Sequence, residues 1–409
     1  MNIHLDELIS SKKVLLLQGP MGSFFKKFSE WLSSLGIECF KINFNAGDWF
    51  YYSGHNVSHY RGKLKKFDVW LNKYLEDNNI DSIVCFGDCR FYHQVARQVA
   101  KQTKTKFFAF EEGYIRPYYI TFEKNGVNAY SKFQECYQNT DISSPIFSQP
   151  DQPRNIDAKY SLILSNAICY YLFLALFFWL YPFYIHHRMI SPLMEVFSWF
   201  KSYLRKFYYS LSEPKTFDRI IKQKGHRYFV VALQVHNDSQ IRVHSDYDDV
   251  VNFIEDVITS FACYAQKDKF LVIKHHPMDR GYRDYTKVIN SLAKKMNISD
   301  RVDYVCDVHL PTLMKNSLGM VTVNSTTGIQ SLHHGKPVIA LGRAIYNLDK
   351  LTFQGKLDDF WLNPGRVNKL YYRRFRYALV RYTQINGSFY GENNWMQIED
   401  RKNDTVKVN

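Results

Sequence analysis

Apolar and polar positions in the first 150 residues alternate between a strand pattern and a helix pattern. Short apolar runs predict strands at residues 13–20, 37–44, 81–88 and 106–113. Apolar side chains at helical spacing predict helices at 23–36, which Gly36 ends, and at 93–103. Strands that alternate with helices form parallel sheets, so this segment is predicted to be an α/β domain.

The same pattern returns after Gly225. Apolar runs predict strands at residues 226–235, 269–277, 301–307, 317–326 and 336–342. Residues 248–265 and 328–335 have the periodicity of helices. Two successive blocks of this kind predict two doubly wound α/β domains that face a cleft. Ligands of such sheets bind beyond the carboxyl ends of the strands.

Residues 151–224 form an insertion of different composition. No charge interrupts residues 161–185, a run long enough for a transmembrane helix, and His-His-Arg follows at 186–188. Residues 194–211 mix apolar, aromatic and basic side chains as an amphipathic helix does. A single membrane span and a buried helical hairpin are alternatives, but a span would separate the two α/β blocks. We therefore expect a monotopic insertion at a membrane surface.

The pattern thus divides the chain into four segments. Residues 1–150 are the N-terminal Rossmann-like domain, 151–224 the hydrophobic helical insertion, and 225–345 the C-terminal Rossmann-like domain. Residues 346–409 are expected to be a helical segment that packs back on the N-terminal domain. Within that segment, residues 369–382 form a basic aromatic helix without an RNA-binding signature.

Charge and aromatic content narrow the class of partner. The chain of 409 residues has a net charge of +14, and 17% of its residues are aromatic. These values favour an anionic partner. Three classes fit equally: nucleic acid, an anionic membrane and a phosphorylated substrate. The seven cysteines are scattered without a CxxC pair, which argues against a zinc ribbon and suits a reducing cytosol. The first residues carry acids and no apolar run, unlike a signal peptide.

Two polar motifs follow predicted strands of the first domain. Gln18, Gly19 and Gly22 lie in a turn before a helix, where a backbone can approach an anion, although an ordinary tight turn explains them equally. Glu111 and Glu112 end a hydrophobic strand, where a carboxylate can serve as nucleophile or general base at a sugar carbon. Arg116 could hold a substrate anion or pair with a glutamate, and a solvated ion pair is the alternative for the whole motif.

Polar residues also end strands of the second domain. Lys274, His276 and Pro277 belong to a Lys-His-His-Pro motif whose cationic groups can neutralise a phosphate. The cysteines around it do not supply zinc ligands at suitable spacing. Asn324, Ser325 and Thr326 precede a helix, where they could cradle an anion, cap the helix, or do both. Gln234 begins a weaker polar motif that continues through 237–239.

Taken in order, five motifs resemble the bacterial capsular polysaccharide synthesis family, and within it the KpsS/LipB type of β-Kdo glycosyltransferase. They are QGPMGSFF, FEEGYIRP, LQVHNDS, KHHP and VNSTTGIQSLHHGKPVIALG. The resemblance spans about residues 12–345 and implies a GT-B-like fold, two Rossmann-like domains with the active site between them. The acidic-acidic-Gly and His-Pro motifs are also similar to those of bacterial sialyltransferases, which use another CMP-activated acidic sugar.

The resemblance also implies roles for individual residues. The nucleotide-sugar donor would be CMP-Kdo, with His276 at its phosphate, Lys274 helping to neutralise it, and Ser325 and Thr326 capping it. Asn324, Gln234 and Pro277 would line the same donor site, and Gln18, Gly19, Gly22 and Arg116 a substrate site in the first domain. Glu112 would be the catalytic carboxylate. Related enzymes carry Asp there, so Glu111 remains a candidate.

The implied acceptor is phosphatidylglycerol, to which a first β-linked Kdo would be added as the start of a capsule linker. No metal and no other cofactor is expected, because basic side chains and helix dipoles would stabilise the leaving CMP. The expected location is the cytoplasm, peripheral on the inner face of the cytoplasmic membrane, with other capsule proteins as further partners. A transferase of another acidic sugar and a non-catalytic capsule export or assembly protein are the alternatives. Nucleic acid is the least supported partner.

Overall fold

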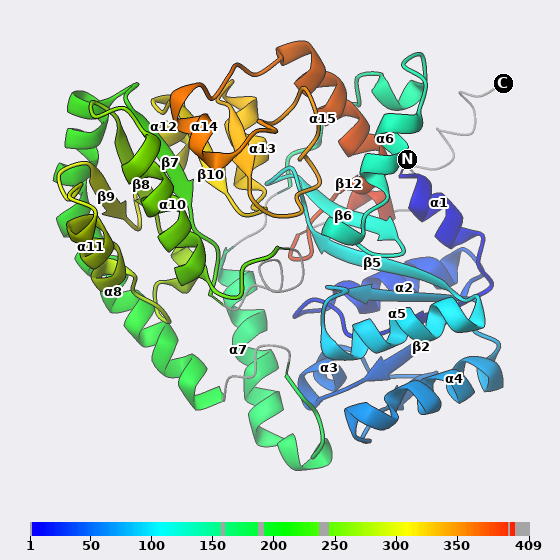
Figure 1. Ribbon diagram of the computed structural model, residues 1–409. Helices are drawn as coiled ribbons and strands as arrows, with labels where there is room; N and C mark the ends of the chain where they lie inside the picture. The colour runs from blue at the N-terminus through cyan, green and yellow to red at the C-terminus, as the bar shows by residue number, and fades with distance from the viewer. Residues whose placement is uncertain (1, 157–159, 187–191, 237–244, 392, 397–409) are drawn as a thin grey trace. The chain divides into compact units, whose positions relative to one another are not determined.

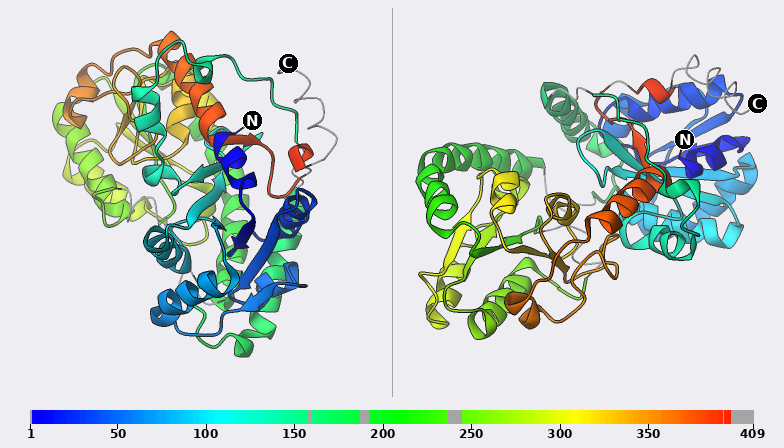
Figure 2. Two further views of the ribbon diagram at one scale, coloured as in Figure 1. Left: turned by 90° about the vertical axis from the view of Figure 1, so that its right-hand side faces the viewer. Right: turned by 90° about the horizontal axis from the view of Figure 1, so that it is seen from above.

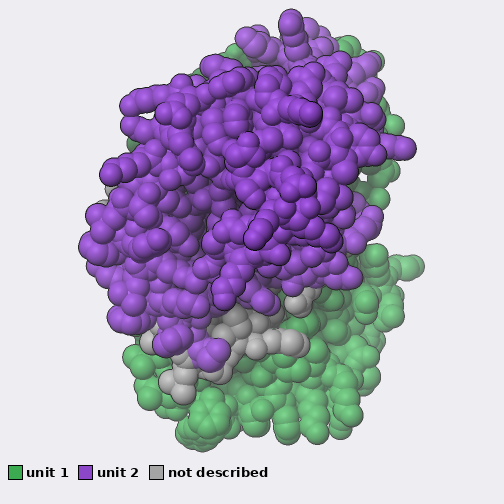
Figure 3. All heavy atoms as spheres, turned by 60° about the vertical axis from the view of Figure 1, so that its left-hand side comes forward, with its two compact units in different colours: residues 1–192, 377–409 green, residues 193–376 purple. Residues whose placement is uncertain are grey.

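The computed structural model describes residues 2–156, 160–186, 192–236, 245–391 and 393–396. The chain divides into two compact units, coloured separately in Figure 3. Unit 1 consists of residues 1–192 together with 377–409, and unit 2 consists of residues 193–376. The carboxyl-terminal residues therefore return to the unit in which the chain begins.

Unit 1 contains a seven-stranded sheet in the order β12-β6-β5-β4-β1-β2-β3. Strands β1 to β5 run parallel, with the strand order of a Rossmann fold. Strand β6 pairs antiparallel with the edge strand β5, and β12 pairs antiparallel with β6, so β12 runs in the same direction as β1 to β5. The strands are β1 Lys13–Leu16, β2 Glu38–Asn43, β3 Val57–His59, β4 Ser82–Phe86, β5 Lys106–Glu112, β6 Tyr119–Lys124 and β12 Gln384–Asn386.

Helices cover both faces of this sheet (Figures 1 and 2). They are α1 Ile3–Ile9, α2 Phe24–Ser34, α3 Ala46–Tyr51, α4 Phe67–Asn78, α5 Phe91–Thr103, α6 Phe133–Asn139 and α7 Tyr160–Leu176. Because successive side chains of a strand point to opposite faces, β1 supplies two cores. Leu15 packs in the core under α4 and α5, whereas Val14 and Leu16 pack under α1 and α2. Helix α15, Lys369–Thr383, crosses from unit 2 into unit 1.

Unit 2 contains a five-stranded parallel sheet in the order β11-β10-β7-β8-β9, again the strand order of a Rossmann fold. Its strands are β7 Tyr228–Ala232, β8 Phe270–Lys274, β9 Val302–Val305, β10 Gly319–Thr322 and β11 Val338–Ala340. Its helices are α8 Pro192–Lys224, α10 Val250–Tyr264, α11 Thr286–Lys295, α12 Leu310–Lys315, α13 Thr327–His333 and α14 Leu357–Leu362. Phe229 and Val231 face α10 and α14, whereas Tyr228 and Val230 face α12 and the end of α8.

The prediction of two doubly wound α/β blocks is confirmed. Among the strands that were not predicted are β6, which follows β5 and runs antiparallel to it, and β12, which joins β6 from a distant part of the sequence. Strand β12 has three residues, too few for a period-2 pattern to be recognised. The cleft between the two domains stays a prediction.

The insertion expected at 151–224 does not form a unit of its own. Helix α7 belongs to unit 1, and α8 belongs to unit 2 except for its first residue. Leu172 and Leu176 of α7 are 50% and 57% exposed, which differs from the buried-hairpin alternative. Within the described ranges, no helix combines the length and the apolar character needed to cross a membrane.

The core under α2 offers a test of this fold. Phe28 is fully buried and lies 5.2 Å from Phe110 between ring centroids, nearly perpendicular to it. Phe28→Ala leaves a cavity, so the free energy of unfolding should fall by about 4 kcal/mol. Val69→Ala, at a position that is 73% exposed in the same unit, should change it by less than about 0.5 kcal/mol. Urea unfolding measures both, and equal losses would contradict this packing.

Candidate active site

The paired glutamates of unit 1 end β5, beside the loop that follows β4. Glu111 accepts a hydrogen bond at Oε1 from the backbone N–H of Glu112, at 3.0 Å. Burial raises the pKa of the Glu111 carboxyl to about 7. The charges of Glu112 and Asp88 add to this rise, and Arg90 opposes it. Glu111 therefore exchanges a proton near neutral pH, which suits a general acid or base.

The loop after β4 contributes residues that the sequence motifs did not single out. Asp88 is 1% exposed and accepts a hydrogen bond from the N–H of Val127 at 2.9 Å. Burial raises the pKa of Asp88 as well. Arg90 donates to the carbonyl of Gly19 at 3.4 Å, so it joins the loop after β4 to the turn after β1. The signal was available, because this polar loop directly follows a predicted strand.

The turn after Glu112 is held by close backbone contacts. A Cβ on Gly113 would lie 1.9 Å from the carbonyl oxygen of Tyr119, so only glycine fits there. Arg116 is exposed, and its Nε donates to the Gly113 carbonyl at 3.3 Å. The side chain of Gln384, in β12, accepts from the N–H of Tyr114 at 3.0 Å. The distant strand β12 thus helps to hold the glutamate pair in position.

The turn after β1 is packed against α7. Gln18 is 4% exposed, and its Nε2 lies 2.9 Å from the hydroxyl of Tyr170, 3.1 Å from that of Tyr184 and 3.2 Å from Oδ1 of Asp48. Gly22 has a φ of +131°, and a Cβ there would lie 2.6 Å from Nδ2 of Asn166. These contacts give Gln18 a structural role. Contact of Gln18, Gly19 or Gly22 with a substrate stays a prediction.

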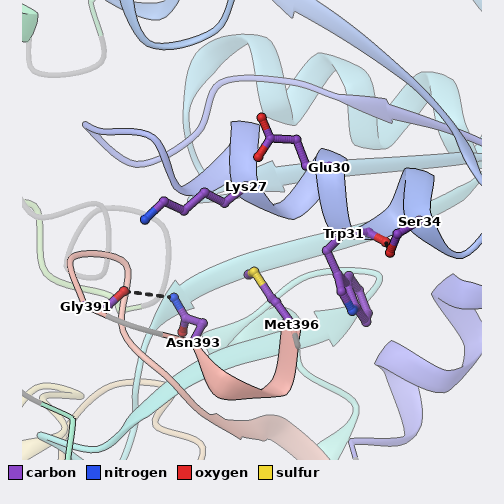
Figure 4. A pocket seen from close by; sticks show the side chains of 7 residues that line it. All are labelled: Lys27, Glu30, Trp31, Ser34, Gly391, Asn393 and Met396. Carbon is purple, nitrogen blue, oxygen red and sulfur yellow. Dashed lines mark hydrogen bonds between the residues drawn. The ribbon is translucent and has the colours of Figure 1, made fainter. Parts of the chain in front are cut away.

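Two cavities lie in unit 1. One of about 190 Å³ lies beside this network and is lined mainly by aromatic and aliphatic side chains, among them Tyr171, Phe178 and Tyr184. The other, of about 330 Å³, lies between α2 and the residues Gly391, Asn393 and Met396 (Figure 4). None of the predicted site residues lines either cavity, so cavity volume does not identify the site.

In unit 2, two of the predicted donor residues, Gln234 and Asn324, are joined at the strand ends. The side chain of Gln234, after β7, donates from Nε2 to Oδ1 of Asn324 at 2.9 Å and accepts from the Asn324 N–H at 3.3 Å. This reciprocal pair joins the ends of β7 and β10, which are neighbours in the sheet. Asn237–Ser239, which complete the polar motif after β7, lie outside the described residues.

The four residues of the Lys-His-His-Pro motif have different environments. Lys274 is 5% exposed, and its Nζ donates to the carbonyls of His275, at 3.0 Å, and Cys306. Burial lowers the pKa of Lys274. His275 is also buried and lies 2.7 Å from the hydroxyl of Tyr304. His276 is half-buried and Pro277 is exposed, so they are the members of the motif that solvent and a ligand can reach.

The hydroxyl cluster after β10 is built as a tight turn. Ser325 Oγ accepts from the N–H of Thr327 at 3.3 Å and from its hydroxyl at 2.9 Å. A Cβ on Gly328 would lie 2.3 Å from the hydroxyl of Tyr346, which donates to the Ser325 carbonyl at 2.6 Å. Ser325 and Thr326 are half-buried at the start of α13, where small oxygen ligands can be bound by hydroxyl and N–H groups.

A buried carboxylate beneath the donor loop was missed from the sequence. Asp279 is fully buried and lies 2.5 Å from Nδ1 of His236 and 3.3 Å from the hydroxyl of Tyr285. Asp279 lies two residues after Pro277, so its closeness to the Lys-His-His-Pro motif was the only signal in the sequence. Asp279 holds the loop after β8 against the end of β7.

Comparison with known proteins identifies relatives along nearly the whole chain. The family model described as "Capsule polysaccharide biosynthesis protein" matches residues 81–390. The capsule polysaccharide export protein KpsS of Escherichia coli is 40% identical, with 94% of this chain and 99% of the relative covered. The capsule polysaccharide modification protein LipB of Neisseria meningitidis serogroup A is 39% identical, with 94% and 93% covered.

Among solved structures, the beta Kdo 2,7 transferase KpsC of Thermosulfurimonas dismutans is 13% identical, with 95% of this chain and 99% of that chain covered. Its TM-score is 0.47. This likeness is weak, and the family is established by the sequence relatives.

The environment of Glu111 predicts a pH dependence of stability. Because its folded pKa of about 7 exceeds its ordinary value of 4.5, folding takes up a proton between these pH values. The associated stability is complete below pH 4.5 and is lost as the pH rises through 7. Glu111→Gln keeps an acceptor for the Glu112 N–H without the charge. It should be more stable than wild type by about 3 kcal/mol at pH 8 and nearly equal to it at pH 4.5.

Urea unfolding at the two pH values measures this difference. Glu255→Gln, on the exposed face of α10, is the control and should track the wild type at both. A stability gain of Glu111→Gln that is the same at both pH values would show that Glu111 is not the titrating group.

Proposed function

The chain belongs to the capsule polysaccharide biosynthesis family, and from this premise we propose that it is a glycosyltransferase that moves β-Kdo from CMP-Kdo to phosphatidylglycerol. The observation that carries the proposal is the different chemistry at the strand ends of its two Rossmann-like units. Unit 1 carries a glutamate pair in which the pKa of Glu111 is near neutrality, and unit 2 carries histidine, amide and hydroxyl groups suited to a nucleotide phosphate.

The donor would be bound by unit 2. His276, Ser325 and Thr326 are half-buried after β8 and β10, the two strands that flank β7, and a phosphate can accept their hydrogen bonds. The Gln234–Asn324 pair would complete the site. Lys274 would act from beneath, because its ammonium group is directed to the carbonyls of His275 and Cys306.

The catalytic carboxylate would come from the glutamate pair of unit 1. We assign the reacting carboxylate to Glu112 and a proton-carrying role to Glu111, whose raised pKa supports it. The close contact of Gly113 with the Tyr119 carbonyl supports the assignment, since it leaves the end of β5 little freedom. No metal takes part in this proposal, because cationic and hydroxyl groups of unit 2 would stabilise the leaving CMP.

A lipid acceptor would bring the protein to the inner face of the cytoplasmic membrane. The net charge of +14 supports this location, because anionic lipids attract basic proteins by about 1 kcal/mol for each well-placed Lys or Arg. The aromatic lining of the cavity of about 190 Å³ in unit 1 supports an acceptor with an apolar part.

A non-catalytic role in capsule export or assembly is the second candidate. The name of the Escherichia coli relative, a capsule polysaccharide export protein, favours this role. In that case the glutamate pair and the donor residues would be dispensable, so variants at these positions separate the two candidates.

The transfer assay is the direct test. The full chain is incubated with CMP-Kdo and a fluorescent phosphatidylglycerol, and the product is weighed by mass spectrometry. Glu112→Gln should lower the rate at least about 100-fold and His276→Ala about 10-fold or more, with folding retained. Glu255→Gln and His309→Ala, both at exposed positions, are matched controls and should keep the wild-type rate.

Absence of a Kdo-modified lipid with folded protein and fresh donor would reject the proposed reaction. Wild-type rates in both site variants would reject the site instead. The assay is repeated with CMP donors of other acidic sugars. A product of the corresponding mass would keep the proposed site and change its donor substrate.

The metal-independent proposal has its own test. Prior treatment with excess EDTA should leave the transfer rate within about twofold of the untreated enzyme, because protein side chains and not a metal ion would stabilise the leaving CMP. Loss of activity that Mg²⁺ or Mn²⁺ restores would show that a metal takes part.

A further inference from the structure

Helix α8 exposes a broad apolar face. Its large apolar side chains between residues 194 and 211 are from 52% to 72% exposed: Met194, Phe197, Phe200, Tyr203, Leu204, Phe207, Tyr208 and Leu211. They recur mostly at intervals of three and four residues. At 3.6 residues per turn they therefore fall within about one half of the helix circumference.

The opposite half of α8 is attached to unit 2 by polar contacts. Arg280 donates from Nε to the carbonyl of Ser202 at 3.1 Å. Arg205 donates to the carbonyl of Arg280 at 2.8 Å and forms an ion pair with Asp284 at 3.0 Å. Glu213 accepts the N–H of Asp307 at 2.7 Å.

This arrangement inverts the usual amphipathic helix. A surface helix normally buries its apolar stripe and exposes its charges. Between residues 194 and 213, α8 binds its own unit through Arg205, Glu213 and serine groups and exposes phenylalanine, tyrosine and leucine, whereas its last turns bury Ile220 in the core of unit 2. Exposed apolar patches of this kind mark interaction surfaces, because they cost free energy in water.

The charges around the face select the occupant. Besides Arg205, which is paired with Asp284, residues 194–212 contain the basic residues Lys201 and Lys206, and their only acidic residue is Glu195. Aromatic side chains together with Lys and Arg are typical of helices in the interface of anionic membranes. A second copy of this chain would bring another charge of +14 to the same surface and is disfavoured by repulsion.

We propose that α8 lies in the interface of an anionic bilayer, with the apolar face of residues 197–211 inserted among the lipids. The proposal rests on the proposed function, whose acceptor is a membrane lipid, and names the element that brings unit 2 to it. The polar contacts of Arg205 and Glu213 hold α8 to the loops after β8 and β9, and the loop after β8 carries the donor residues His276 and Pro277.

Vesicle binding tests the proposal. The full chain is sedimented with phosphatidylcholine vesicles with and without 30% phosphatidylserine, a lipid that is not the proposed acceptor. Wild type should bind the anionic vesicles at least about tenfold more tightly than the neutral ones. The triple variant Phe200→Gln, Phe207→Gln, Leu211→Gln should lose at least about tenfold in affinity, and its exposed positions leave the fold intact.

A matched control removes equally exposed apolar side chains elsewhere in unit 2. Tyr264→Gln, Leu362→Gln and Leu370→Gln change positions that are 50%, 55% and 57% exposed, and this variant should bind vesicles as wild type does. Equal affinities of wild type and the α8 variant would overturn the proposal. So would a wild-type dimer in sedimentation velocity that the α8 variant abolishes without any vesicle binding.

A second readout separates this proposal from the proposed function. Transfer to a short-chain, water-soluble phosphatidylglycerol should be unchanged in the α8 variant, whereas transfer to phosphatidylglycerol in vesicles should fall about tenfold. If wild type transfers to neither acceptor but binds vesicles through α8, the function is rejected and the membrane face stands. If wild type and the α8 variant transfer equally to vesicle lipid and bind vesicles equally, the membrane face is rejected and the function stands.

Discussion

A parallel sheet that is covered by helices on both faces can present polar side chains only where its strands end. In both units this constraint determines where chemistry is available. The interiors of the central strands are apolar, as Val14 and Leu15 in β1 and Val230 and Val231 in β7 illustrate. The charged and hydroxyl side chains follow directly after them, and the hydrogen bonds among those side chains decide which ones a ligand can reach.

Desolvation is the second consequence of this architecture. Glu111 and Asp88 are enclosed at the ends of β5 and β4, and their pKa values rise because burial disfavours the charged form. Burial lowers the pKa of Lys274 by the same principle. Groups that titrate away from their ordinary range at a strand end are candidates for catalysis, and Glu111 combines this property with a pKa near neutrality.

Polar contacts join the two inserted helices to their units beside apolar packing such as that of Phe173 on Phe50 and of Ile220 in the core of unit 2. Tyr170 of α7 meets Gln18 and Asp48 through its hydroxyl, and α8 is attached through Arg205 and Glu213. Each helix therefore keeps part of its apolar surface outside its unit. The apolar and aromatic composition of α7 and α8 is therefore explained by surfaces that face away from their units.

The sequence by itself determined the two α/β blocks, because a strand that is buried on both faces must be apolar along its length and its neighbours must repeat at helical spacing. It also located the polar strand ends, including Glu111, His276 and Ser325. Only the tertiary structure decided which of these polar side chains a ligand can reach, since Lys274 and His276 differ in burial although they lie two residues apart. It alone brought β12 to the edge of β6 and turned the apolar face of α8 outward, because contacts between distant residues leave no local periodicity in the chain.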